Sequence, residues 1–520
     1  MRILRLILIN ISLTAILFMV ASKNVEVVYA DTIRIGLESR YNNAQMIDMT
    51  NTALFFGTDV AGEFAISGQM NSPAGFSVLV DNAYYLDLGI VVPSFDEAYA
   101  LQSGYGKAVV HFMTDGQFGI YVGPFGDMVD AMETQSTYGG TVTAPHSGQI
   151  RVVAGEQNLL VADAPLQLID ATGALMLLGG RSYRGIMEIG RQTGAGITPV
   201  NIVDVEMYLY SVVPSEMPAS WNIEAVKAQA VTARSYTFTS RGSHAHLGYE
   251  LTDTVVSQVY SGVDTEHPNS TRAVDETRGI MAFYNDVPIL GTYFSSSGGY
   301  TESSEYVWIE AVPYLRAVSD NFEQGAMEWE RSFSLSEINQ LAASQNLGIG
   351  HITSVSTSGD TPGGRVLNLN LHGELGTHTL TGESIRTFFS GSAEGSLQSR
   401  MFSIVEGIGS EVSTGGDFDT LIVAGSQMDI QRQSRGSAIL SASGLSELGT
   451  ELSVLSSRGI FGSRGATQNM TQSTGDRVSF AGRGWGHGVG MSQFGANSMA
   501  NQGFDYRQIL QHYYTGVVVR

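Results

Sequence analysis

Cysteine is absent from the whole sequence. Disulfide bonds, thiol nucleophiles, and zinc or iron–sulfur sites built on cysteine are therefore excluded. If the protein is exported, it must fold without covalent cross-links. Any nucleophile, acid or base must come from other residue types.

Positive charge is also scarce, with 28 lysines and arginines against 50 aspartates and glutamates and a formal net charge of −22. Such a chain repels phosphate backbones, which argues against nucleic acid as a partner. Charged residues make up only 15% of the sequence, whereas hydrophobic residues reach 43% and glycines number 61. This composition indicates a turn-rich globular protein, and 520 residues are enough for two or three domains.

Long apolar runs are missing except at the N-terminus. There, Arg2 and Arg5 precede the stretch "LILINISLTAILFMVA", and "VYA" before Asp31 has the small–x–small form of a cleavage site after Ala30. Residues 1–30 are predicted to be a signal peptide. The alternative is a membrane anchor, because the stretch is nearly long enough to span a bilayer. Both alternatives place the rest of the chain outside the cytoplasm.

Alternating hydrophobicity and frequent turn residues predict an α+β fold. We expect N-terminal strands over residues 31–74, a β-rich domain over 139–408, and a glycine-rich loop followed by helices over 476–520. Residues 409–475 are dense in Ser, Gly and Thr and are predicted to form a long exposed insertion. The alanine-rich run after Trp221 predicts a buried helix with little side-chain bulk.

Residues 75–134 are predicted to form a small α+β unit with an internal duplication. "VPSFDEAYA" and "GPFGDMVDAM" each combine a strand end, a short loop and a helix start. The segment "FGIYVGPFGDMVDA", Phe118 to Ala131, resembles the SPOR domain. The resemblance implies a peptidoglycan-binding module that recognises glycan strands stripped of their stem peptides. The alternative is an ordinary α+β insertion.

One glutamate stands out in the stretch "VVPSEMPASW". Pro214 and Pro218 lie on either side of Glu216, its neighbours are largely apolar, and a helix capped by Ser220 or Asn222 follows. We expect a braced, desolvated loop, which would raise the pKa of Glu216 as a general acid at neutral pH requires. The nearby helix N-terminus acts in the opposite direction but fades outside the first turn. The alternative is a glutamate that caps a helix or forms a salt bridge.

A second candidate site lies in "GRGWGHGVGMSQFGA". Five glycines around Arg483, Trp485 and His487 allow positive φ angles and close approach of the backbone to a ligand. Trp485 suits stacking on a sugar ring, and His487 suits a hydrogen bond to a sugar hydroxyl. The alternative is a tight turn with a structurally bonded histidine.

A third candidate is the polar loop "YFSSSGGYTESSEYVW", Tyr293 to Trp308. Tyr293, Glu302 and Glu305 are candidates for substrate contacts, and the alternative is a solvated loop. A serine hydrolase is disfavoured because no G-x-S-x-G motif is present. The H-x-H pair of His244 and His246 is a weak metal signal, and no H-E-x-x-H motif occurs.

Three motifs occur in the order seen in one known family: "YLYSVVPSEMPASWNIEAVKAQAVTARSYT", "SSSGGYTESSEYVW" and "GRGWGHGVGMSQFGANSMANQGFDYRQILQHYYTG". From about Gly139 to the end, the chain resembles the SpoIID/LytB family. This resemblance implies a β-rich catalytic domain and a lytic transglycosylase of peptidoglycan glycan, with the catalytic glutamate at Glu216. The residues expected to contact substrate are Arg234, Tyr293, Ser296, Ser297, Trp485, His487 and Gln493.

The resemblance also sets expectations for partners and metals. It implies peptidoglycan glycan strands as substrate, a cell-wall amidase as a candidate partner, no cofactor, and a secreted or membrane-anchored protein facing the wall. The alternative function is that of a non-catalytic, peptidoglycan-binding amidase enhancer. Some family members carry a zinc site of Cys and His, but the matching stretch here is "ELTDTVVSQVY", with Thr252, Val256 and Ser257 instead. No metal is therefore predicted.

Overall fold

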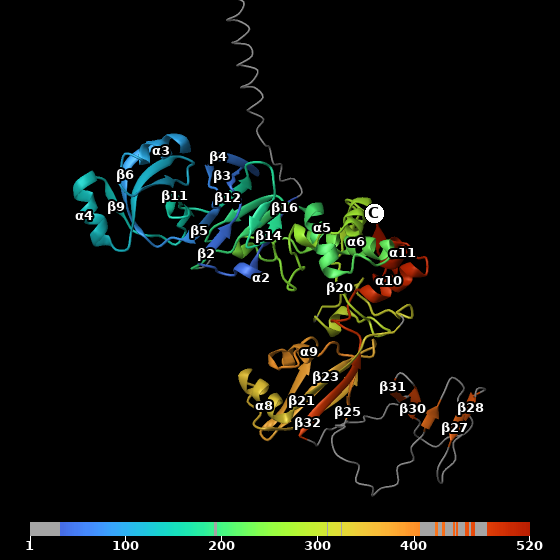
Figure 1. Ribbon diagram of the computed structural model, residues 1–520. Helices are drawn as coiled ribbons and strands as arrows, with labels where there is room; N and C mark the ends of the chain where they lie inside the picture. Colours follow the sequence, from blue (N-terminus) through green and yellow to red (C-terminus); the bar gives the residue numbers. More distant parts are fainter. Residues whose placement is uncertain are drawn as a thin grey trace, which may run out of the picture.

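Two large sheets and a cluster of helices carry most of the chain (Figure 1). The computed structural model describes residues 32–191, 195–308, 310–323, 325–405 and 476–520, and the backbone of six short strands between 422 and 462. The predicted leader, residues 1–30, and most of the predicted insertion, residues 409–475, lie outside the described residues. The prediction of an α+β fold is confirmed.

The first sheet has seven strands in the order β17-β1-β16-β15-β12-β3-β4, and only the pair β1 and β17 is parallel. It joins strands from the N-terminal region with β16, which directly precedes the first long helix of the helical cluster. Its strands are β1 Thr32–Gly36, β3 Ala53–Val60, β4 Glu63–Asn71, β12 Leu166–Asp170, β15 Ile186–Ile189, β16 Val200–Asp204 and β17 Leu251–Thr252.

The second sheet has ten strands in the order β14-β13-β2-β5-β10-β11-β7-β8-β6-β9, and only β7 and β11 are parallel. Its strands are β2 Met46–Met49, β5 Phe76–Val80, β6 Tyr84–Val92, β7 Ala108–Phe112, β8 Phe118–Phe125, β9 Thr141–Thr143, β10 Ile150–Ala154, β11 Gln157–Ala162, β13 Met176–Leu178 and β14 Arg181–Tyr183.

Four strands of the second sheet and two helices form a split βαβ unit. Along the chain the unit runs β6, α3 (Phe95–Gln102), β7, β8, α4 (Met128–Tyr138) and β9, with sheet order β7-β8-β6-β9. Its two strand–helix repeats lie where the duplicated sequence predicts them. The unit shares its core with the first sheet, because Phe95 of α3 packs edge-on against Phe56 of β3 with ring centroids 5.0 Å apart. The SPOR assignment stays a prediction.

A helical cluster lies between the first sheet and a lower lobe (Figure 1). At its centre is α6, whose N-cap Asn222 accepts a hydrogen bond from the Glu224 N–H, as predicted from the sequence. Alanines and other small residues are buried along α6, so α5, α7, α10 and α11 can all pack closely against it. The bounds of these helices are α5 Val205–Glu216, α6 Ile223–Thr239, α7 Pro268–Glu276, α10 Gln493–Asn501 and α11 Tyr506–Tyr513.

A lower lobe lies between the second and third sequence motifs and has a hydrophobic core of its own. Its stacked Phe333 and Phe389 rings are 4.4 Å apart. The lobe consists of β21 Glu328–Ser334, α8 Leu335–Ser344, β22 Ile352–Asp360, β23 Val366–Gly373, β24 Gly376–Thr381, α9 Ser384–Thr387, β25 Phe402–Val405 and β32 Arg477–Arg483.

The remaining short elements connect these parts. They are α2 Glu38–Tyr41, β18 Ala282–Tyr284, β19 Val287–Pro288, β20 Tyr293–Phe294, β33 Met491–Ser492, β34 Val518–Val519, and the hairpins β26 Ile422–Ala424 with β27 Asp429–Gln431, β28 Leu440–Ser441 with β29 Gly444–Leu445, and β30 Ser453–Ser456 with β31 Gly459–Gly462. Among the helices of the described residues, none combines the length and apolar character needed to cross a bilayer.

Arg234 belongs to the core of the helical cluster rather than to a substrate surface. Its side chain is fully buried, and its Nε and Nη2 donate to the two carboxylate oxygens of Glu206 on α5 at 2.9 and 2.6 Å. Nη1 donates to the Ile280 carbonyl at 3.0 Å. The expectation that Arg234 contacts substrate is therefore wrong for this structure, because a fork-like ion pair between α5 and α6 uses the guanidinium.

Replacing Arg234 should destabilise the helical cluster. Arg234→Met leaves the Glu206 carboxylate buried without its partner, which we expect to cost about 3–5 kcal/mol of unfolding free energy. Calorimetry of purified variants measures the change as a fall in Tm. Arg272→Met, which removes a solvent-exposed ion pair with Glu276, is the matched control and should leave the Tm nearly unchanged. Equal Tm values for the two variants would contradict this role for Arg234.

Candidate active site

Glu216 is the last residue of α5, not part of a loop as the sequence suggested. Pro214 lies inside the final turn of the helix, although a proline there removes one i→i−4 hydrogen bond. Met217 is extended, with φ −133° and ψ 136°, because a residue before a proline avoids the helical region. Pro218 therefore fixes the point at which the helix ends, and the Glu216 side chain projects from that end.

The Glu216 carboxylate is largely buried and has few compensating partners. Its Oε1 accepts a hydrogen bond from the Val259 N–H at 2.9 Å. Burial raises the pKa of Glu216, and the Val259 N–H and the Tyr293 hydroxyl lower it by a smaller amount. The C-terminal end of α5 also disfavours negative charge. The net effect is a raised pKa for Glu216, as the sequence predicted.

Gln493 holds the backbone at Glu216. This residue starts α10, is buried, and its Nε2 donates to the Glu216 carbonyl oxygen at 2.9 Å and to Gln229 Oε1 on α6 at 3.3 Å. The third sequence motif is thereby tied to the end of α5 and to the central helix. Gln493 lies at the predicted site, but its contacts are with the protein, so it acts as a positioning residue.

Gln258 organises the tyrosines around Glu216 and was not identified from the sequence. Its Oε1 accepts from the Tyr208 hydroxyl at 3.3 Å and from Thr237 Oγ1 at 2.9 Å. Its Nε2 donates to the Tyr293 hydroxyl oxygen at 3.4 Å. Tyr293 is thus oriented beside the carboxylate. The only sequence signal for this residue is its place in the "SQVY" segment beside Val259.

The loop that carries Gln258 and Val259 is closed by hydrogen bonds. Thr252 N donates to Ser257 Oγ at 3.1 Å, and the Thr252 and Thr254 hydroxyls are 3.0 Å apart. These residues occupy the stretch in which some members of the resembled family carry a zinc site. Among the residues that the structure describes, no group of three or more His, Asp or Glu side chains could hold a metal ion.

Ser296 and Ser297 are buried and bind a protein carboxylate. Both hydroxyls donate to Glu323, and the Ser297 N–H donates to Glu323 Oε2 at 2.7 Å. The sequence predicted that these serines line a cleft and contact substrate. That expectation is wrong for this structure, because Glu323, which the sequence analysis did not consider, takes up their donors.

The glycine-rich motif folds back beside the serine loop. β33 runs parallel to β20, and Trp485 forms an isolated bridge with Ser296. Gly486 and Gly488 have φ angles of 109° and 90°, which only glycine adopts readily, so the predicted positive φ angles are present. At Gly488, a Cβ atom would lie 2.6 Å from the buried Arg365 guanidinium.

His487 is a neutral structural link in this loop. Its Nδ1 accepts from the Val489 N–H at 3.0 Å, and its ring also interacts with the Tyr293 backbone. Burial lowers the pKa of His487 to about 3, and the charge of Arg386 acts in the same direction. Both ring nitrogens are therefore engaged by the backbone near Glu216, in place of the predicted sugar contact.

Exposed aromatic rings gather on the second and third sequence motifs. Trp485 is 43% exposed, as predicted for a stacking residue, and Trp308 is 38% exposed and lies 5.0 Å from the His487 ring. Tyr300 and Phe494 are also exposed, and Phe494 packs edge-on against Trp221. We call Tyr300, Trp308, Trp485 and Phe494 the aromatic surface.

Comparison with known proteins agrees with the first of the three motifs. The family model described as SpoIID, Stage II sporulation protein, matches residues 193–284, which include α5, α6 and the Val259 loop. Amidase enhancer from Bacillus subtilis (strain 168) is 30% identical over 315 residues, 60% of this chain and 40% of that protein. Stage II sporulation protein D from the same organism is 27% identical over 340 residues, 62% of this chain and 75% of that protein.

A further relative, Stage II sporulation protein D from Bacillus amyloliquefaciens, is 28% identical over 338 residues, 61% of this chain and 74% of that protein. The chain thus spans well under half of the amidase enhancer and about three quarters of the two sporulation proteins. Glu216, Gln258 and Val259 lie within the family match, whereas Tyr293 and Gln493 lie outside it. The chain therefore carries a domain of the SpoIID family.

Proposed function

We propose that this protein is an exported lytic transglycosylase that cleaves the bond between N-acetylmuramic acid and N-acetylglucosamine in peptide-stripped glycan strands. The observation that carries the proposal is the buried Glu216 carboxyl group with its raised pKa, held between Val259 and Tyr293. A protonated carboxylic acid at neutral pH is the group that a glycosidic oxygen needs as general acid.

A single carboxyl group is enough for this reaction. Protonated Glu216 donates its proton to the glycosidic oxygen as the bond from that oxygen to muramyl C1 breaks. The muramyl C6 hydroxyl oxygen then forms a bond to C1, and the Glu216 carboxylate accepts the C6 hydroxyl proton. The products are a 1,6-anhydro sugar and a free hydroxyl on the other fragment, and no water is consumed. Hydrolysing glycosidases need a second carboxylate to activate water or attack C1.

The groups next to Glu216 fit this single-acid scheme. The hydrogen-bonding neighbours of its carboxyl group in the described part of the chain are the Val259 N–H and the Tyr293 hydroxyl, neither of which is a second carboxyl group. Tyr293 can support the carboxylate that forms after the first proton transfer. Each ring of the aromatic surface has an exposed face on which a sugar ring can stack.

Amidase enhancement is a second candidate function, favoured by the relative that bears the name Amidase enhancer. In this alternative, the aromatic surface would bind glycan and Glu216 would have no chemical role. The raised pKa of Glu216 favours the enzyme, because a binding surface gains nothing from a buried acid. Under both alternatives we propose an extracytoplasmic protein of the cell wall or the sporulation apparatus.

Replacing Glu216 should abolish cleavage. Purified wild-type protein, incubated with amidase-treated glycan strands, is expected to release anhydromuramyl products detectable by mass spectrometry. Glu216→Gln keeps the shape but cannot donate the proton, so product should fall by at least about 100-fold. Glu328→Gln, an exposed residue of β21, is the control. Product formation by Glu216→Gln would refute the assigned role. If the wild-type protein releases no product but stimulates an amidase, the amidase-enhancer function is favoured.

The pH dependence should report the raised pKa of Glu216. Only the protonated form is a general acid, so kcat/KM falls as pH rises through the pKa of Glu216. The Tyr293 hydroxyl lowers this pKa, and Tyr293→Phe should therefore raise it and move the fall in kcat/KM to higher pH. Rate profiles on glycan strands between pH 4 and 9 measure the shift. A shift to lower pH would contradict this relation between Tyr293 and Glu216.

The aromatic surface should contribute to substrate affinity rather than to proton transfer. Trp485→Ala and Trp308→Ala are each expected to raise KM for glycan strands by about tenfold, with little change in kcat. Tyr138→Ala removes an exposed ring from α4 and serves as the matched control. An unchanged KM in both tryptophan variants would show that glycan binds elsewhere.

A further inference from the structure

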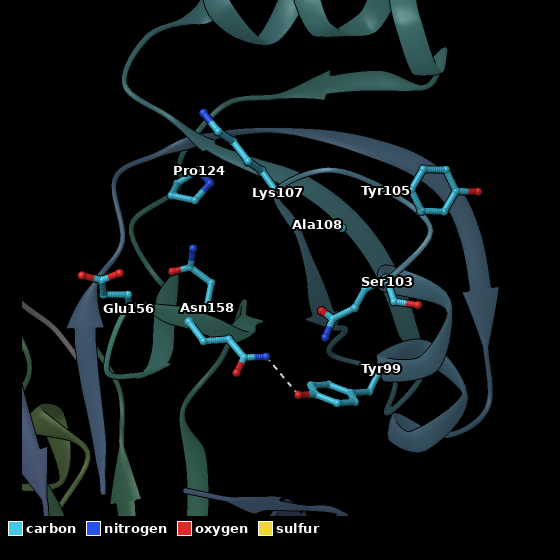
Figure 2. A pocket seen from close by; sticks show the side chains of 11 residues that line it. Tyr99, Ser103, Tyr105, Lys107, Ala108, Pro124, Glu156 and Asn158 are labelled. Atoms are coloured by element: carbon cyan, nitrogen blue, oxygen red, sulfur yellow. Dashed lines mark hydrogen bonds between the residues drawn. The ribbon is translucent and has the colours of Figure 1, made fainter. Parts of the chain in front are cut away.

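A groove between the split βαβ unit and the start of β11 contains none of the residues around Glu216. Its volume is about 660 Å³, within the roughly 300–1,000 Å³ range of small-molecule sites. The end of α3, the start of β7, Pro124 and the turn between β10 and β11 line it (Figure 2). No motif in the sequence indicates this groove.

Gln102 is the feature that indicates a ligand. The side chain lines the groove and the residue is only 9% exposed, yet its Oε1 has no hydrogen-bond partner. An unsatisfied buried acceptor destabilises the folded chain unless a donor reaches it. A ligand N–H or O–H in the groove would satisfy this oxygen.

The polar lining is rich in carboxamides. Gln102, Gln157 and Asn158 all face the groove, and Gln157 Nε2 donates to the Tyr99 hydroxyl oxygen at 2.9 Å. A carboxamide offers a C=O acceptor and N–H donors, which match the N–H and C=O of a peptide group. Three such side chains in one groove can pair with successive peptide groups. The partly exposed Tyr99 ring offers an apolar face for a small side chain.

Two unpaired charges of opposite sign complete the lining. Lys107 and Glu156 are exposed and lie on different sides of the groove, with Asn158 near Glu156 (Figure 2). Neither forms an ion pair within the described part of the chain. A ligand with one carboxylate and one ammonium group would complement both charges. A polyphosphate would meet one cation and one anion, which gives no net attraction.

We infer that this groove binds a short peptide with free amino and carboxyl groups. Its carboxylate pairs with Lys107, its ammonium group pairs with Glu156, and a peptide N–H between them donates to Gln102 Oε1. The inference is independent of the reaction at Glu216, since none of these residues takes part in it.

Ligand-observed NMR titration of the purified protein tests the inference with trialanine as the probe. Blocked N-acetyl-trialanine amide lacks both charges, and tri-N-acetylchitotriose represents a saccharide. Trialanine should bind at least about tenfold more tightly than either of the other probes. Glu216→Gln should bind trialanine like wild type, so failure of the proposed enzyme function leaves this result unaffected.

Variants identify the groove as the binding site. Gln102→Met keeps the side-chain length and removes the acceptor, and it should weaken trialanine binding about tenfold. Lys107→Asn and Glu156→Gln each remove one charge, and each should weaken trialanine binding about tenfold without a change in Tm. Asparagine is chosen at position 107 because it tolerates the positive φ of 56° there. Glu133→Gln on α4 is the control. Preferential binding of chitotriose, equal binding of the blocked peptide, or unchanged affinity in Lys107→Asn and Glu156→Gln would overturn the inference.

Discussion

The hydrogen bond from the Val259 N–H to the Glu216 carboxylate joins residues 43 positions apart, and the candidate site depends on it. One neutral backbone donor is enough to orient a buried carboxyl group. It is too little to offset the cost of ionising that group away from water. The balance therefore raises the pKa of Glu216. A lysine or arginine side chain in place of the Val259 N–H would have lowered the pKa of Glu216. The carboxyl group would then have lost the capacity to act as a general acid.

The packing around α6 makes this arrangement possible. Because its buried face is built from alanines and other small residues, α5 and α10 approach α6 closely from separate parts of the sequence. Arg234 and Glu206 fix α5 against α6, and Gln493 links α10 to both the Glu216 carbonyl and Gln229. The end of α5 is thereby fixed by buried side chains.

Features of the fold and the candidate site that depend on residues close together in the sequence could be predicted. The buried small-residue helix, its Asn222 cap, the positive φ angles of the glycine motif and the exposure of Trp485 all follow from residue types and spacing. The raised pKa of Glu216 was also expected from its apolar neighbours and flanking prolines. The helical position of Glu216 was missed, because the flanking Pro214 and Pro218 indicated a braced loop, whereas Pro214 lies inside the last turn of α5.

The errors concern side chains whose partners lie far along the chain. Arg234 pairs with Glu206, 28 residues earlier, and Ser297 with Glu323, 26 residues later. Sequence spacing alone could not distinguish these internal partners from a substrate. Gln258 was missed for the same reason, since its role depends on Tyr208, Thr237 and Tyr293 meeting in the fold. The groove beside Gln102 likewise forms only when α3 meets the turn before β11.

The most direct measurement of the central claim is an infrared titration of the carboxyl groups, taken as the difference between wild-type protein and Glu216→Gln. The account predicts that the difference signal, which isolates the Glu216 carboxyl group, titrates above 4.5, the ordinary pKa of a glutamate. A midpoint at or below that value would mean that the carboxylate is stabilised in the folded protein, and the proposed proton donor would not exist at neutral pH.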